Sequence, residues 1–336
     1  MKRAPLGRCW LVLLSVPALF VAGCHLLVPP TILAVDPVGA RVYVRDAGNT
    51  AIRVVDARTH ETVARIPLDV LIDGLAVNPS NGELYAAGDR SILVIDPSGG
   101  QASAAIPLGA EIAALAVNAS GTKLFVLHGH PDGISVIDTR ARRTVSTLSA
   151  DSPSAMVVPP GVDHVYLAQY AADSSGGVGE SVISLLETDR LSPITATSLK
   201  TFQPLGLALD PSGTRLYAVG IVGAKGEGDG KSPIGGVLVL ETGGLRVVAS
   251  LPLGALPAAV AVNPAGTRAY VLDNAAGTLT VLSTLSHTIL ETVAVREGPL
   301  AIALNASGTE VYISHSDGTL TIVNALTNRV TGENRP

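Results

Sequence analysis

The feature that most constrains the fold is a repeat, in which one aromatic residue recurs seven times within the same short motif. The aromatic positions are Tyr43, Tyr85, Phe125, Tyr166, Tyr217, Tyr270 and Tyr312, at intervals of 42, 40, 41, 51, 53 and 42 residues. Recurrence at a near-constant period indicates a repeat architecture, in which each repeat is one supersecondary unit. The 336 residues therefore need not divide into two separate domains, as a chain of this length usually does.

A turn motif begins seven positions before each aromatic residue. In six of the seven copies a short apolar run ends in Asp or Asn followed by Pro or Ala, and Asn263 to Gly266 is the clearest example. Asn or Asp in the first position, Pro in the second and Gly in the fourth favour a type I turn, because the side chain caps the turn and Pro fixes φ. We therefore predict that one strand, A, turns tightly into a second strand, B. The fourth copy has Pro159-Pro160 instead, which leaves its turn geometry open.

Two further strands complete each unit. Strand C is a short apolar run that ends in an acid, as in Ile92 to Asp96, and strand D is more variable and ends near Ile66 in the first unit. Four-stranded units of about 40–45 residues are the sequence signature of a β-propeller. The sequence thus predicts an all-β fold, a seven-bladed β-propeller of four-stranded antiparallel blades over residues 31–336. The seven aromatic side chains are expected in the core between blades.

Composition agrees with this fold and excludes some functions. Hydrophobic residues make up 47% of the chain and charged residues 15%, which excludes a disordered chain, and 35 Gly and 22 Pro favour short strands joined by turns. The formal net charge is −5, and it becomes −8 without the first 23 residues, because 20 basic residues then face 28 acidic ones. A body of this charge repels phosphate backbones, so we expect no nucleic-acid partner.

The N-terminus carries a secretion signal. Three basic residues precede an apolar run from Trp10 to Ala22, which is shorter than the about 20 residues that a membrane-spanning helix needs. Residues 1–23 are therefore predicted to be a signal peptide. At its end, Val21-Ala22-Gly23-Cys24 resembles the bacterial lipobox, and the resemblance implies that Cys24 is lipidated and becomes the new N-terminus. An uncleaved anchor, or an ordinary signal with Cys24 as a chance thiol, is the alternative.

Lipidation would place the protein in the cell envelope. We expect it in the outer membrane, facing the periplasm or the surface, if the host is Gram-negative, and on the extracytoplasmic face of the cell membrane otherwise. Residues 24–30 would then form a lipid-anchored tether. Alternatively, Leu26 to Val28 could complete blade seven, whose own fourth strand looks like a stub over Arg329 to Thr331. Pro29-Pro30 and a three-residue apolar run make a poor strand, which favours the tether.

The repeat also resembles a known family. Ala261 to Val271 reads Ala-Val-Asn-Pro-x-Gly-Thr-x-x-Tyr-Val, and Val-Ile-Asp occurs in strand C of blades two and three. This pattern, which extends from about Thr31 to Val330, is similar to the YVTN-type, surface-layer-like β-propeller repeat of bacterial surface and periplasmic proteins, although most copies lack the Asn after Tyr-Val. The resemblance implies the propeller fold. It implies little about chemistry, because such propellers serve as binders, scaffolds and a few enzymes.

Variation in loop length points to a binding face. The B–C loops of blades four and five, roughly 171–179 and 221–235, are about ten residues longer than the others and lie in neighbouring blades on one face. The candidate binding residues in and beside them are Asp173, Glu180, Lys225, Glu227, Asp229 and Lys231. We predict that the two loops form a partner-binding lip. A tolerated surface insertion is the alternative, because lengthening a loop costs little entropy.

Two acids and two histidines are the remaining candidates for chemistry. Asp73 and Glu111 fall in D–A connections at the expected mouth of the axial channel, where they could bind a cation or be solvated turn residues. His128 and His130 are weak candidates for a local metal site and, like His315, are expected in B–C loops. The sequence has no Cys-x-x-Cys-His haem motif and no Trp outside the leader, so we expect no cofactor.

These observations together predict a non-catalytic binding or scaffold module, anchored in the cell envelope and monomeric. Its partner would be an envelope protein or a glycan, bound on the face that carries the B–C loops and D–A connections. One alternative, drawn from other seven-bladed propellers, is a lactonase-like hydrolase with a metal at the channel mouth. Another is a structural component of a surface layer. The sequence leaves open whether the chain is an enzyme.

Overall fold

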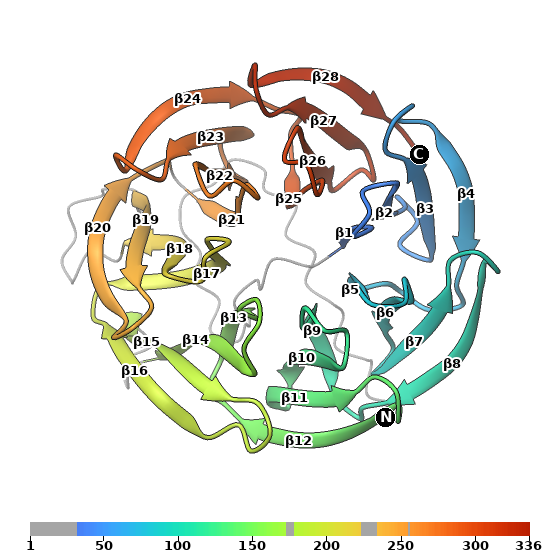
Figure 1. The fold of residues 1–336 in the computed structure, drawn as a ribbon, viewed down its shortest axis with the longest axis horizontal. Coiled ribbons are helices and arrows are strands. Elements are labelled where there is room, and N and C mark those ends of the chain that lie inside the picture. Colours follow the sequence, from blue (N-terminus) through green and yellow to red (C-terminus); the bar gives the residue numbers. More distant parts are fainter. Residues whose placement is uncertain (1–31, 173–177, 223–233, 255) are drawn as a thin grey trace, which may run out of the picture.

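The structure, a computed structural model, describes residues 32–172, 178–222, 234–254 and 256–336. Its strands β1 to β28 form seven four-stranded antiparallel sheets, each with its strands in chain order (Figure 1). The sheets are arranged around a central axis, with the first strand of each innermost and the fourth at the rim. The seven-bladed propeller predicted from the repeat is therefore confirmed. In the described part of the chain, no helix is long and apolar enough to cross a membrane.

The four strand positions recur in every blade. The A strands are β1 (Leu33–Val35), β5 (Gly74–Val77), β9 (Glu111–Val117), β13 (Pro153–Val157), β17 (Phe202–Leu209), β21 (Pro257–Val262) and β25 (Pro299–Leu304). The B strands are β2 (Arg41–Arg45), β6 (Leu84–Gly88), β10 (Lys123–His130), β14 (His164–Ala172), β18 (Arg215–Val222), β22 (Arg268–Asp273) and β26 (Glu310–His315). The C strands are β3 (Ala51–Asp56), β7 (Ser91–Asp96), β11 (Asp132–Asp138), β15 (Val178–Glu187), β19 (Ile234–Glu241), β23 (Thr278–Ser283) and β27 (Leu320–Asn324). The D strands are β4 (Thr62–Pro67), β8 (Gln101–Pro107), β12 (Arg143–Ser149), β16 (Pro193–Leu199), β20 (Arg246–Pro252), β24 (Thr288–Ala294) and β28 (Arg329–Asn334).

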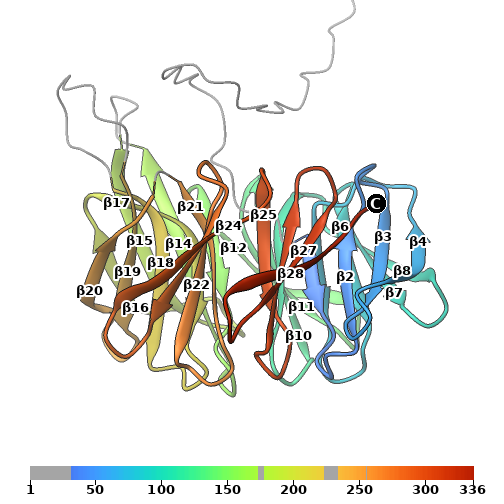
Figure 2. The same ribbon diagram turned by 90° about the horizontal axis from the view of Figure 1, so that it is seen from above.

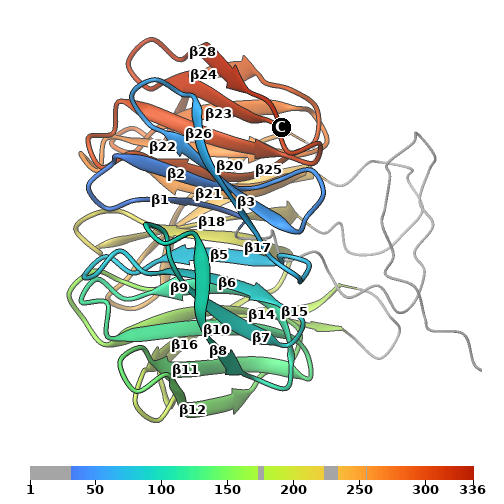
Figure 3. The ribbon, with the colours of Figure 1, turned by 90° about the vertical axis from the view of Figure 1, so that its right-hand side faces the viewer.

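The antiparallel order gives the propeller two faces, which lie at opposite ends of the strands (Figures 2 and 3). The A–B and C–D turns lie on one face, and the B–C loops and D–A connections lie on the other. Because β1 is an A strand, the described chain enters the first blade from the B–C/D–A face. Any segment that precedes Ile32 therefore joins the propeller on that face.

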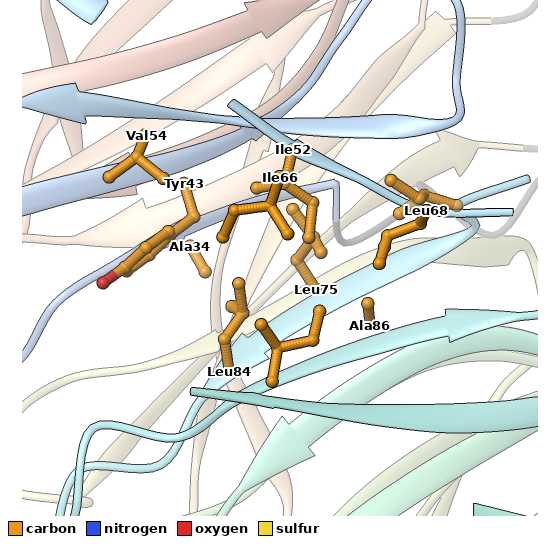
Figure 4. Packing of buried hydrophobic residues seen from close by; sticks show 11 residues of the cluster. Ala34, Tyr43, Ile52, Val54, Ile66, Leu68, Leu75, Leu84 and Ala86 are labelled. Atoms are coloured by element: carbon orange, nitrogen blue, oxygen red, sulfur yellow. The ribbon is translucent and has the colours of Figure 1, made fainter. Parts of the chain in front are cut away.

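The repeated aromatic residues form the core between the blades, as predicted. All seven are buried, and Tyr85, Phe125, Tyr270 and Tyr312 have no exposed surface. Tyr43 of blade one belongs to a cluster with Leu75 and Leu84 of blade two (Figure 4). Each aromatic ring therefore joins two blades, and this packing accounts for its recurrence at the period of the blade.

Each D strand carries a β-bulge at the same place, shortly after the C–D turn. In blade one, Val54 pairs with Ala64 and Val55 pairs with Thr62, so Val63 between them has no partner on β3. A bulge bends an edge strand and interrupts its ladder of backbone groups. The outer edges of the blades are thereby made poor templates for pairing with another sheet.

The last blade closes the ring with its own chain. The predicted stub over Arg329 to Thr331 is wrong, because β28 continues to Asn334 and pairs with β27 as far as Leu320. The strand extends further because its end binds blade one, where the Asn334 amide donates to the His60 carbonyl over 3.0 Å. The alternative closing strand, Leu26 to Val28, lies outside the described residues.

Candidate functional site

A hollow of about 250 Å³ lies between blades four and five on the B–C/D–A face. We call it the blade 4/5 hollow. It is lined by Ser198, Leu199, Lys200, Thr201, Phe202, Val222, Leu238 and Ser250. Lys200 and Thr201 form the D–A connection between β16 and β17, and Val222 ends β18 where the longest B–C loop begins. The hollow therefore lies beside the base of that loop.

The lining of the blade 4/5 hollow combines apolar and polar groups. Phe202 and Leu238 belong to the packing between the two blades, whereas Lys200 and Thr201 are exposed. Among the described residues, Lys200 has no ion-pair partner. An apolar wall with a few polar groups at its edge is the usual composition of a site that binds a small ligand or a protruding side chain.

Glu180, one of the predicted binding residues, lies next to this hollow. Its side chain is exposed and accepts a hydrogen bond from the Ser198 hydroxyl, which lines the hollow. The neighbouring Ser181 is fully buried, and its hydroxyl has no hydrogen-bond partner among the described residues. Because Ser181 pairs with Leu199, their side chains lie on the same side of the sheet. The Glu180 carboxylate thus lies beside the blade 4/5 hollow, whereas the Ser181 hydroxyl is buried on the other side of the sheet.

The other predicted loop residues, Asp173, Lys225, Glu227, Asp229 and Lys231, lie outside the described residues. The predicted boundaries of the two loops need a small correction. Strand pairing continues to Ala172 and Val178 in blade four and to Val222 and Ile234 in blade five. The two hairpins thus extend one or two residues further at each end than the predicted loop bounds allow.

The two predicted channel-mouth acids each lie near an arginine. Asp73 precedes β5, and its charge raises the pKa of Arg45, although burial lowers that pKa by more. Glu111 begins β9, is exposed, and lies 3.9 Å from Nη2 of Arg90. The described part of the chain holds no group of three or more His, Cys, Asp or Glu side chains placed to bind a metal. The structure therefore supplies two acids in neighbouring blades and no third ligand beside them in that part.

The histidines lie in strands, which corrects their prediction as loop residues. His128 and His130 belong to β10, and His315 ends β26. His315 is fully engaged, because Nδ1 lies 3.2 Å from the Glu297 carbonyl and Nε2 lies 2.8 Å from the Thr321 hydroxyl. Burial lowers its pKa.

His128 is also buried, and its Nε2 has no hydrogen-bond partner in the described part of the protein. Burial lowers its pKa as well, so the ring is neutral at pH 7. The side chain of His130 lies outside the described part.

Both described histidines occupy the position three residues after the repeated aromatic. In two blades the side chain there binds the D–A connection that enters the same blade. In blade seven this is the contact of His315 with the Glu297 carbonyl, and in blade six the carboxylate of Asp273 accepts from the backbone amide of Leu256 over 3.2 Å. In blade five the position is Gly220, where a Cβ would collide with the Gln203 carbonyl oxygen. In blades six and seven this position therefore holds the D–A connection in place.

Sequence reasoning missed the buried charges at the junction of blades one and seven. Arg53 and Asp46 are each 2% exposed, with 3.7 Å between the Arg53 Nε and the Asp46 Oδ1. The Arg53 guanidinium donates to the Gly318 carbonyl and, over 2.7 Å, to the Asn334 side chain. An arginine in the middle of an apolar C strand was the signal that could have identified this site.

The comparisons with known proteins bear on the fold. No protein-family model matches the sequence, and no curated protein matches it. A solved structure titled Kuenenia stuttgartiensis hydrazine synthase superimposes with a TM-score of 0.76 over 94% of this chain and 99% of the other, at 18% identity. A likeness at this level of identity shows a shared propeller fold and carries no information on activity.

Proposed function

We propose that this protein is a non-catalytic binding module of the cell envelope and that it takes its partner at the blade 4/5 hollow. The observation that carries the proposal is the position of this hollow beside the longest B–C loop, with Lys200 unpaired among the described residues. Loops of unusual length on a rigid scaffold are where binding residues concentrate. The partner would be an envelope protein or a glycan that presents an acidic or hydroxyl-bearing group to Lys200.

Lipidation at Cys24 forms the second part of the proposal. It rests on the Val21-Ala22-Gly23-Cys24 sequence. The described chain enters the first blade at the B–C/D–A face, so a tether would leave from that face. A tether of about seven residues reaches at most roughly 25 Å. The face with the blade 4/5 hollow would then stay close to the lipid surface, and the partner would be one that lies at that surface.

The test is co-purification from envelope extracts of the native host. Lys200→Glu should reduce recovery of the partner at least about tenfold, because reversing a charge at a desolvated contact costs more than about 1.4 kcal/mol. Arg190→Glu is the matched control, because it makes the same charge change in blade four on the opposite face. Arg190 is exposed, in the turn before β16. Equal recovery with both variants would contradict the proposed site.

The two alternative functions have their own measurements. A hydrolase with a metal at the channel mouth would retain stoichiometric metal after purification and lose it in Asp73→Asn. A surface-layer component would show a native mass of many copies. The binding module should retain no stoichiometric metal and should have the mass of a monomer.

A further inference from the structure

A second hollow lies on the opposite face of the propeller, between blades two and three. Its volume is about 430 Å³, and we call it the blade 2/3 hollow. It is lined by Asn78, Ser80, Asn81, Glu83, Gly121, Thr122, Thr139, Arg140 and Arg142. These residues come from the A–B turn of blade two and from both turns of blade three. Every lining side chain is polar, in contrast to the mixed lining of the blade 4/5 hollow.

A repeated position in the C–D turns explains why a hollow forms here. One residue in each of these turns has a positive φ: His60, Gly100, Arg142, Leu191, Leu245, His287 and Asn328. In blades four and five the residue is a leucine, 1% and 0% exposed respectively, that packs into the core between blades. In blade three it is Arg142, whose Nη2 binds Oε1 of Glu83 in blade two over 3.0 Å. An ion pair at the surface thus replaces the buried leucine side chain. The space that a leucine would fill is left as a hollow lined by polar groups.

The floor of the blade 2/3 hollow is built from buried, bonded side chains. Asn78 is 1% exposed, and its Nδ2 donates to the Gly121 carbonyl over 2.9 Å. The Thr139 hydroxyl, also buried, donates to the same carbonyl over 2.7 Å. The A–B turns of two blades and a C–D turn are therefore held together beneath the hollow. A ligand would meet a preformed surface, which reduces the entropy lost on binding.

The charge of the hollow is positive, in a chain whose net charge is −5. Arg142 and Glu83 neutralise each other, and Arg140 adds one uncompensated positive charge. Arg140 is exposed and has no ion-pair partner among the described residues. The side-chain oxygen Oδ1 of Asn81 accepts from the backbone N–H of Glu83 over 3.0 Å, which leaves the side-chain NH₂ group of Asn81 as a donor. No aromatic ring lines the hollow, so it offers no stacking surface to a neutral sugar.

We propose that the blade 2/3 hollow is a binding site for an oxyanion, a carboxylate or phosphate group carried by a polar ligand. The Arg140 guanidinium presents two parallel N–H donors, and this fork matches the two oxygens of such a group. The Asn81 amide supplies a further donor. The site lies on the face away from the blade 4/5 hollow, so it is independent of the function proposed above.

The test is calorimetric titration of the purified full-length chain with inorganic phosphate and with glucuronate, with glucose as the neutral control. We expect saturable binding of at least one anion in the millimolar range and none of glucose. The anion that binds more tightly identifies the source of the oxyanion. Arg140→Ala should weaken binding at least about tenfold, because a bidentate contact to a charge is lost. Arg58→Ala, at the same turn position in blade one, should leave binding unchanged.

A second variant tests the shape of the hollow rather than its charge. Arg142→Leu combined with Glu83→Gln gives blade three the leucine that blades four and five have at this turn position. There the leucine has the same positive φ. It should fold with an unchanged melting temperature and lose anion binding. The proposal is overturned if neither anion binds saturably, if Arg140→Ala binds as tightly as the wild type, or if Arg58→Ala is weakened equally. None of these results would alter co-purification through Lys200.

Discussion

Asn334 ties the last strand of the propeller to the first blade, and its replacement by alanine gives the sharpest test of how the ring closes. Its Oδ1 accepts from Nη1 of Arg53 over 2.7 Å, and its Nδ2 donates to the His60 carbonyl over 3.0 Å. Arg53 is 2% exposed, and its Nε already lacks a hydrogen-bond partner in the described part of the chain. Asn334→Ala would therefore leave a buried guanidinium with one acceptor fewer.

The magnitude follows from these contacts. A hydrogen bond to a charged group contributes about 1.5–3 kcal/mol, and a neutral one contributes about 0.5–1.5 kcal/mol. Asn334→Ala should therefore lower the free energy of unfolding by about 2–4 kcal/mol. At roughly 2–4 °C per kcal/mol, the conversion for domains of about 150–250 residues, the melting temperature should fall by about 4–16 °C.

Thermal unfolding followed by circular dichroism measures this change. Arg335→Ala is the control, because its exposed side chain makes only a 3.1 Å surface pair with Glu333. Such a pair contributes less than about 1 kcal/mol. In an Arg53→Met background, the cost of Asn334→Ala should drop to about that of the neutral hydrogen bond alone, below about 1.5 kcal/mol. An Asn334→Ala protein that melts together with Arg335→Ala would refute this account of closure.

Two further predictions concern the anchor and the buried histidine. Cys24→Ser should move the protein from the membrane fraction to the soluble fraction and remove the acyl mass; a wild-type mature mass without lipid would rule out lipidation. Burial lowers the folded-state pKa of His128 below the ordinary histidine value of 6.5. Its neutral form therefore stabilises the fold above pH 6.5, and that stability is lost as pH falls from 6.5 toward the folded pKa. Blade four has Gln169 at this position, so His128→Gln places a residue there that the fold already accepts. Between pH 7 and 5, the unfolding free energy of this variant should fall less steeply than that of the wild type, by up to about 1.4 kcal/mol per pH unit. An unchanged slope of unfolding free energy against pH would show that another group causes the acid sensitivity.

The sequence by itself determined the fold, because every signal that defines it is local and periodic. The type I turn at Asn263 depends on residues within four positions, and its carbonyl accepts from the Gly266 amide over 2.8 Å as the motif requires. The aromatic at Tyr270 needs only the next blade to bury it. Because each blade repeats these features, seven copies imply seven blades. Loop lengths likewise indicated which face varies, and Glu180 lies beside the blade 4/5 hollow as a member of the predicted lip.

The tertiary structure alone decided which side chains meet where blades join. Arg53 and Asn334 are 281 residues apart, and no periodic pattern pairs them. The same turn position holds Leu191 in blade four and Arg142 in blade three, and the structure shows that the leucine fills the junction between blades whereas the arginine pairs with Glu83 beside a hollow. His128 and His315 come directly after the apolar residues of their strands, so the sequence predicts them in loops. In the structure, backbone pairing continues through both residues and keeps them in the sheet. A repeat specifies its own unit, whereas a site between units depends on contacts that are distant in the chain and differ from one junction to the next.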